Sequence, residues 1–113
     1  MSLKKSTEIP GGYVGEYWSI KAYERLDFIG RKAVVIFSLW KDAAAYAAGE
    51  TAQPENAGRL VLEGERFDFY LSKAALAAAE TDINAQTYLA AKAEPMDFWF
   101  ARASRYLADA ENV

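Results

Sequence analysis

Three carboxylates, Glu63, Glu65 and Asp68, fall close together in the sequence. Closely spaced carboxylates can carry acid/base chemistry or bind a divalent cation. The surrounding residues predict a turn and the polar face of a strand, where such side chains are usually solvated, so we expect no catalytic or metal site there. Pro10-Gly11-Gly12 precedes a predicted strand and lacks the Gly-Lys-Ser/Thr element of a phosphate-binding loop, which leaves it as a turn.

The chain contains no histidine and no cysteine. It therefore lacks the commonest general base, the usual zinc ligands, thiolate nucleophiles and disulfides. The remaining Asp, Glu, Lys and Tyr residues show no spacing that nominates a catalytic set. We expect a protein that is not an enzyme and needs no cofactor.

Aromatic residues make up 14% of the chain and are its best candidates for binding. Exposed rings can stack on sugars or bases, or anchor a protein partner. A two-residue period from position 17 places Tyr17 and Tyr23 on one face with Lys21 and Arg25, and Trp40 ends the next apolar run. These five residues form the candidate binding surface, with core packing as the competing interpretation.

The residues that must position this surface form two runs, 13–28 and 33–40, separated by Ile29-Gly30-Arg31. We predict an antiparallel hairpin whose other face carries Trp18, Ile20, Ala22, Leu26 and Phe28. The second run is apolar almost throughout, so it should be covered on both faces or lie against a partner chain. A first strand of about 15 residues exceeds the usual length and predicts a bulge near Gly15 or Glu24. Glu24 either marks that bulge or an edge, or serves as a binding carboxylate.

Sequence signals divide the rest of the chain into short segments. Residues 1–8 are polar and predict a disordered start, and residues 49–58 predict an exposed loop. Asp42 can cap a helical turn that ends at Gly49, and residues 59–71 predict either a tight hairpin or one strand bent at Gly64. Ser72, Asp82 and Asp97 can cap three C-terminal helices, the last with an apolar stripe from Trp99 to Ala110.

These segments predict one α+β domain over residues 1–113: an antiparallel sheet of about four strands from the N-terminal two-thirds, packed on one side by C-terminal helices. The net charge is −3, which argues against nucleic-acid binding. The sequence has neither a leader-type apolar segment nor a stretch of about 18 apolar residues, so we expect no membrane association.

Three stretches of the sequence resemble small proteins encoded in the tail regions of phages and prophages. They are KKSTEIPGGYVGEYWSIKA, VVIFSLWKDAAAYAAGE and ASRYLADAENV. The shared features are a basic start and glycine turn before Tyr17-Trp18, a strand ending in Trp40-Lys41-Asp42 before an alanine-rich segment, and a Tyr106-Leu107 pair before a small acidic tail. The AEPMDFWFARAS segment departs from this pattern. The resemblance implies a virion or tail-assembly protein without catalytic residues, located in the bacterial host cytoplasm or the assembled virion.

Two functions remain open from the sequence. The first is a structural or tail-assembly protein that binds itself, as a homo-oligomer, or other phage tail proteins. The second is a small carbohydrate-type binding module that uses Tyr17, Tyr23 and Trp40 as stacking platforms, with Lys21, Arg25 or Asp27 as polar anchors.

Overall fold

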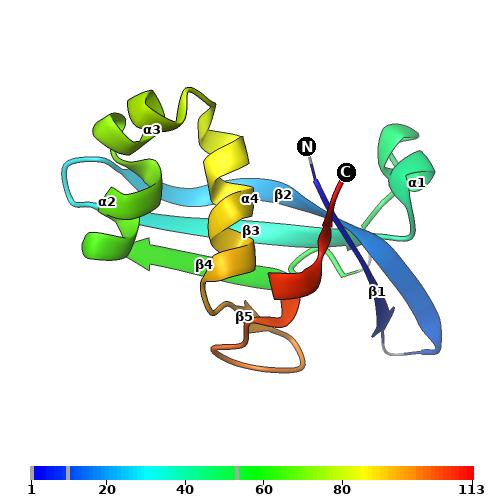
Figure 1. Ribbon diagram of the computed structural model, residues 1–113. Coiled ribbons are helices and arrows are strands. Elements are labelled where there is room, and N and C mark those ends of the chain that lie inside the picture. Colours follow the sequence, from blue (N-terminus) through cyan, green and yellow to red (C-terminus); the bar gives the residue numbers. More distant parts are fainter. Residues whose placement is uncertain (1, 10, 53) are drawn as a thin grey trace.

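A computed structural model describes residues 2–9, 11–52 and 54–113 (Figure 1). All its strands join one antiparallel sheet, in the order β5-β4-β3-β2-β1-β6. The strands are β1 (Leu3–Ile9), β2 (Tyr13–Asp27), β3 (Lys32–Trp40), β4 (Gly58–Glu63), β5 (Asp97–Phe98) and β6 (Glu111–Asn112). The helices are α1 (Ala43–Ala47), α2 (Glu65–Leu71), α3 (Lys73–Ala79), α4 (Ile83–Ala93) and the 3-10 helix η1 (Tyr106–Asp109).

The predicted hairpin of β2 and β3 is confirmed and forms the centre of the sheet. The ladder advances by two residues in β2 for one in β3 at two points, so Lys21 and Glu24 are the extra residues of two bulges. The expected bulge at Glu24 is therefore present. No register shift lies at Gly15 itself; the nearby irregularity falls between Lys4 and Thr7 of the opposite strand, β1.

The two bulges change which side chains face the helices. The first bulge reverses the alternation, so that Ala22 is exposed while Tyr23 turns toward α4, and the second restores it. The simple two-residue period was therefore wrong for Ala22 and Tyr23. Trp18, by contrast, is fully buried as expected.

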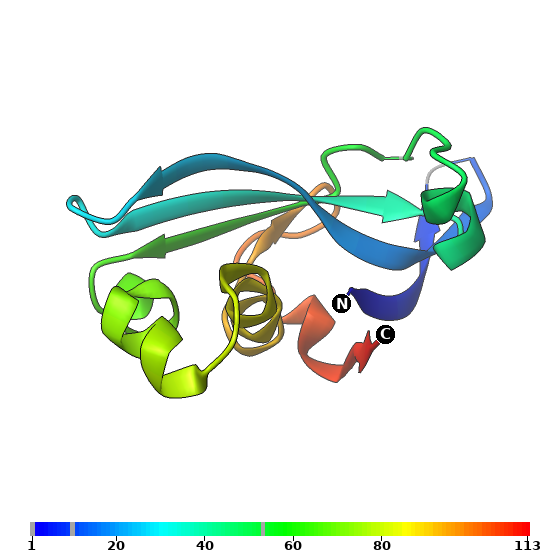
Figure 2. The ribbon, with the colours of Figure 1, turned by 90° about the horizontal axis from the view of Figure 1, so that it is seen from above.

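The helices α2 and α4 and the C-terminal segment cover one face of the sheet, while the other face has no helical layer over its centre (Figure 2). The core lies under this cover. The largest fully buried side chains include Trp18, Phe37 and Phe67. Every residue of β3 from Ala33 to Leu39 is at most 8% exposed, so the chain itself buries this apolar strand.

The C-terminal third differs most from expectation. Residues 65–71 form helix α2 rather than a strand, because Phe67, Tyr70 and Leu71 meet the core at helical spacing while Phe69 is 72% exposed. The helix expected from Trp99 to Ala110 is absent. Residues 97–104 fold back as a loop that begins in β5, and η1 follows it. With β5 and β6, the sheet has six strands instead of about four.

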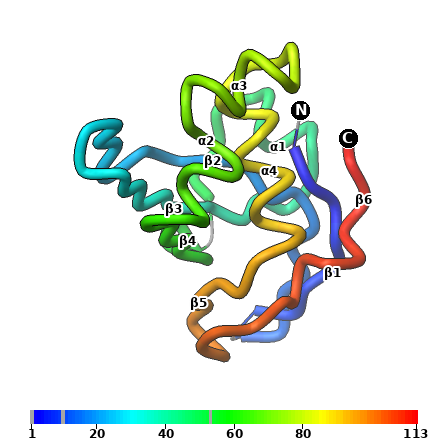
Figure 3. Tube along the Cα trace, turned by 60° about the vertical axis from the view of Figure 1, so that its left-hand side comes forward, coloured from blue at the N-terminus to red at the C-terminus, as the bar shows by residue number. Residues whose placement is uncertain are grey.

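Residues 3–8, expected to be disordered, belong to β1, which pairs with β2 and β6. Ser2 and Val113 exchange two backbone hydrogen bonds of 2.8 and 3.0 Å, so the two ends of the chain lie side by side (Figure 3). Of the predicted turn at residues 10–12, Gly11 and Gly12 adopt positive φ angles and Pro10 lies outside the described residues. In the described part of the predicted loop 49–58, residues 49–51, 55 and 56 are exposed, whereas Ala52 and Ala57 are buried and Gly58 begins β4.

Three of the four predicted helix caps are present, and Asp97 lies in β5 instead of capping a helix. The Asp42, Ser72 and Asp82 side chains each accept a hydrogen bond from the backbone N–H three residues later. None of the helices in the described ranges is long and apolar enough to cross a membrane.

Candidate interaction surfaces

Two of the five predicted binding residues form one aromatic cluster. Tyr17 and Trp40 are paired across β2 and β3, and Tyr46 of α1 packs on both, with ring centroids 5.0 Å from Tyr17 and 4.9 Å from Trp40. The Trp40 indole donates to the Glu50 carbonyl oxygen at 3.0 Å. The Tyr46 ring is 43% exposed, so this cluster presents a partly open aromatic surface. The sequence did not nominate Tyr46, although it lies six residues after Trp40.

Tyr23 lies on the α4 side of β2, where it lines a small pocket together with Lys21 and Tyr46. Its hydroxyl donates to Asn84 of α4 at 2.7 Å and lies 3.0 Å from the Thr87 hydroxyl. Burial raises the pKa of this Tyr23 hydroxyl, although the Thr87 hydrogen bond partly offsets the effect. Tyr23 therefore helps to fix α4 on the sheet.

Lys21 and Arg25 both make ion pairs within the chain. Lys21 pairs with Glu55 at 3.6 Å, and Arg25 pairs with Asp27 at 3.4 Å. The five predicted residues thus divide among the aromatic cluster, the contact with α4 and two surface ion pairs. The structure brings Tyr17 and Trp40 together in the aromatic cluster and Lys21 and Tyr23 together in one pocket, and Tyr46 belongs to both.

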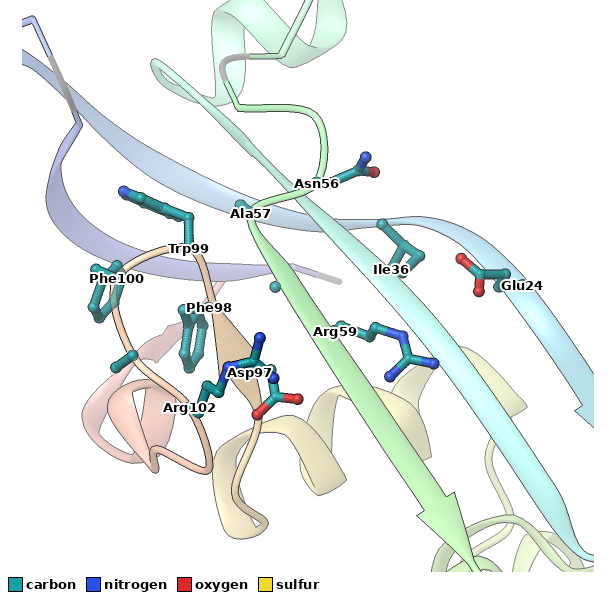
Figure 4. A pocket seen from close by; sticks show the side chains of 12 residues that line it. Glu24, Ile36, Asn56, Ala57, Arg59, Asp97, Phe98, Trp99, Phe100 and Arg102 are labelled. Carbon is teal, nitrogen blue, oxygen red and sulfur yellow. The ribbon is translucent and has the colours of Figure 1, made fainter.

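A separate hollow of about 800 Å³ lies where β4 begins, between the β2 bulge and loop 97–102 (Figure 4). Sequence reasoning did not identify it, because its walls come from segments far apart in the chain. The apolar part of its wall includes Ile36, Phe98, Trp99 and Phe100. Its polar part includes Glu24, Asn56, Arg59, Asp97 and Arg102.

Loop 97–104 holds the aromatic wall of this hollow in place. Met96 and Ser104 exchange two backbone hydrogen bonds of 2.9 Å, and the Asp97 carboxylate accepts from the Ala103 N–H at 2.9 Å. Trp99 stacks on the buried Trp18 with the centroids 6.3 Å apart. These contacts order the loop while leaving Trp99 37% exposed.

Three charged residues of the hollow differ from most other charges on this side of the sheet. Within residues 2–9, 11–52 and 54–113, no ion pair or side-chain hydrogen bond engages Glu24, Arg59 or Arg102. The Asp97 carboxylate accepts from the Ala103 N–H through one of its two oxygens, and Asp97 lies opposite Arg59 in the β4–β5 ladder. The hollow therefore offers Glu24, Arg59 and Arg102 to an external partner, with the Asp97 carboxylate beside Arg59.

The described part of the chain holds no group of three or more Asp or Glu side chains arranged to bind a metal ion. Comparisons of the chain with protein-family models, curated proteins and solved structures found no match.

Proposed function

We propose that this protein is a structural or tail-assembly component of a phage or prophage tail and acts through protein–protein contacts rather than catalysis. The tail assignment rests on the sequence resemblance described above. The contact role is supported by one structural observation: aromatic rings lie exposed at both the Tyr46 cluster and loop 97–102, beside a sheet face without a helical layer.

The exposed fractions of three aromatic side chains favour contact with a macromolecule. Tyr46, Trp99 and Phe100 are 43, 37 and 45% exposed, although each ring also packs on another ring of the same chain. Aromatic side chains anchored in this way lose little conformational entropy when a partner covers them, and they dominate the energetics of many protein interfaces.

The proposal is tested in the bacterial strain that encodes the chain. After induction of particle production, the tagged full-length protein should co-purify with tails or tail intermediates on a density gradient. Deletion of its reading frame should reduce the number of complete tails seen by electron microscopy. Complete infectious particles formed without the protein, together with its absence from all tail fractions, would contradict the proposal.

The aromatic cluster supports a second candidate function, a carbohydrate-type binding module. The half-buried Tyr17 and Trp40 rings and the exposed Tyr46 ring could stack on a sugar, with Lys21 as a nearby polar group. A glycan array followed by tryptophan fluorescence titration tests this function. Binding that is lost in Tyr46→Ala would favour it, and silence across a broad panel would remove it.

A further inference from the structure

The face of the sheet opposite the helices carries a short apolar stripe between charges. Ala22 of β2, Ile36 of β3 and Arg59 of β4 occupy one row of the ladder, and Val34 and Val61 pair in a neighbouring row. Val34 and Ile36 are only 4 and 8% exposed, because neighbouring side chains already cover them. A partner on this face would therefore be selected mainly by the charges that flank the stripe.

Most of those charges are neutralised within the chain. At the hairpin end of the face, Arg25 pairs with Asp27 and Lys32 pairs with Glu63. At the other end, Lys21 pairs with Glu55. Among the described residues of β2, β3 and β4 on this face, Glu24 and Arg59 make no ion pair. Both are exposed, Glu24 on β2 and Arg59 on β4, on either side of β3 (Figure 4).

The outer edge of β2 is poorly suited to strand-to-strand association. The described part of β1 pairs with β2 only as far as Trp18, so the outer edge of β2 beyond Trp18 has no neighbouring strand in the described residues. The two bulges interrupt this edge, and the Tyr88 hydroxyl already accepts from the Ile20 N–H at 2.9 Å. Bulges, covered groups and charges are the usual means of preventing edge-to-edge pairing. The face of the sheet is therefore the better candidate for an interface.

The positions of Glu24 and Arg59 are self-complementary under one symmetry operation. In two sheets stacked face to face, about 10 Å apart, a two-fold axis parallel to β3 places the β2 side of each sheet over the β4 side of the other. Ala22 of each copy then faces Arg59 of the other. Glu24 lies two positions farther along β2, and the long side chains of Glu24 and Arg59 span this offset to form two new ion pairs. A two-fold axis across the strands would instead oppose Glu24 to Glu24, which is unfavourable.

We propose that the partner on this face is a second copy of the chain, joined by a face-to-face two-fold contact in which Glu24 and Arg59 pair reciprocally. The inference rests on the proposed function and specifies one contact through which that function operates. Because the apolar stripe is short and already shielded, the association is weak, with a Kd in the micromolar range.

Charge reversal provides the first test. The wild-type chain should reach twice its 12.5 kDa mass in concentration-dependent sedimentation or light scattering. Glu24→Arg and Arg59→Glu should each weaken the dimer by at least about tenfold, since each change breaks both ion pairs and opposes like charges. The double variant, Glu24→Arg with Arg59→Glu, should restore it. Lys73→Glu on α3, which lies among the helices, should have no effect.

Cysteine cross-linking gives a second measurement, which reports which residues face each other in the dimer, and the natural absence of cysteine keeps the background clean. A mixture of Glu24→Cys and Arg59→Cys chains should form a covalent dimer with a thiol-specific bifunctional cross-linker that spans about 10 Å, the distance between stacked sheets, whereas either variant alone should cross-link far less. Lys73→Cys mixed with either variant is the control.

Two results would overturn this inference. One is a wild-type chain that stays monomeric up to about 1 mM. The other is a double charge-reversal variant that dimerises no better than the single variants, together with equal cross-linking in every mixture. Neither outcome depends on the tail fractions examined for the proposed function. A monomer that still co-purifies with tails would exclude the self-contact and leave the assembly role supported.

Discussion

Gly15 shows how a single residue limits the packing of the sheet. A Cβ added at this position would lie 2.7 Å from Cγ of Leu39, and Leu39 is fully buried. Real side-chain contacts are not this short, so either the strand or Leu39 would have to move. Glycine is therefore required here by close approach to a neighbouring side chain.

Gly15→Ala should lower the free energy of unfolding by about 1–3 kcal/mol, as expected for overpacking in a core. Urea denaturation followed by tryptophan fluorescence measures this change. The same substitution made in a Leu39→Ala background should cost clearly less, because the side chain that it meets has been shortened. Equal costs in the two backgrounds would show that the contact with Leu39 is not the reason for glycine.

Asp27, at the turn between β2 and β3, should make the stability of the fold depend on pH. Its carboxylate accepts from the Gly30 N–H at 2.7 Å, and this bond, assisted by Arg25, holds the pKa of Asp27 below its ordinary value. A lowered pKa in the folded state stabilises the fold at pH values above the unfolded-state pKa. That contribution is lost as the pH falls through the folded-state pKa.

Wild-type protein should therefore be more stable than Asp27→Asn at neutral pH, and the difference should shrink as the pH falls through the folded-state pKa. Chemical denaturation at a series of pH values, with an NMR titration of the Asp27 carboxyl carbon, measures both quantities. A difference in unfolding free energy that stays constant from pH 7 to about pH 2 would contradict this assignment.

Among the elements, α4 connects the helical layer to the exposed end of β2. The Tyr88 hydroxyl lies 3.0 Å from the Ser19 hydroxyl and accepts from the Ile20 N–H, while Thr87 meets Tyr23. The Asp82 side chain caps the start of this helix by accepting from the Ala85 N–H at 2.8 Å. Asp42 makes an equivalent cap on α1, where only Ala45 is buried.

Asp82→Ala should lower the free energy of unfolding by about 1 kcal/mol, because it removes a cap from a helix that packs on the core. Asp42→Ala removes the same type of bond from a peripheral helix and should change global stability much less. Thermal and urea denaturation of the two variants compare these effects directly. An equal loss in both would mean that α1 unfolds together with the rest of the molecule.

Local chemistry explains why these caps were predictable while other elements were not. A cap depends on one side chain and a backbone group three residues away, and both are visible in the sequence. The stripe from Trp99 to Ala110 has helical spacing, but Asp97 accepts from Ala103, which has a positive φ of 47°, and Trp99 packs on Trp18. Contacts across the fold therefore overrode the local pattern.

At the scale of the whole molecule, the sequence correctly predicted an α+β domain with a helical layer on one side of an antiparallel sheet. It did not predict that the N-terminal and C-terminal segments add the strands β1 and β6 to one side of that sheet. In β1, Leu3, Thr7 and Ile9 are buried in alternation with exposed neighbours, but Lys5 occupies the intervening inward position and hides the strand pattern. The Lys5 ammonium contacts Asp109 at 2.6 Å and lies 3.8 Å from the Tyr106 ring centroid. These partners, about 100 residues away, cannot be identified by a local pattern.

The hollow beside loop 97–102 was equally inaccessible to sequence reasoning. Arg59 and Glu24 were assigned to separate strands, but the place of Glu24, as the extra residue between the Tyr23–Val35 and Arg25–Val34 pairs, depends on the exact register of β2 and β3. Register is set by the combined packing of both faces, and a shift of one residue would move every later side chain to the other face. The bulge at Lys21 also turned Tyr23 toward α4, whereas Tyr17 and Trp40 of the predicted set remain paired across the two strands.

The strand β1 provides a prediction for the whole fold, because it joins both ends of the chain to the core. Leu3 is fully buried, lies opposite Trp18 and is paired with Asn112 of β6, whereas the adjacent Lys4 is exposed and makes a surface ion pair with Glu16. Leu3→Ala should lower the free energy of unfolding by about 2–5 kcal/mol through lost burial and a new cavity. Lys4→Ala should change it by less than about 1 kcal/mol.

Urea denaturation, with hydrogen exchange at the β1 and β6 amides, separates the two cases. If Leu3→Ala cost no more than Lys4→Ala, β1 would be a dispensable edge and the two ends of the chain would fold independently of the core.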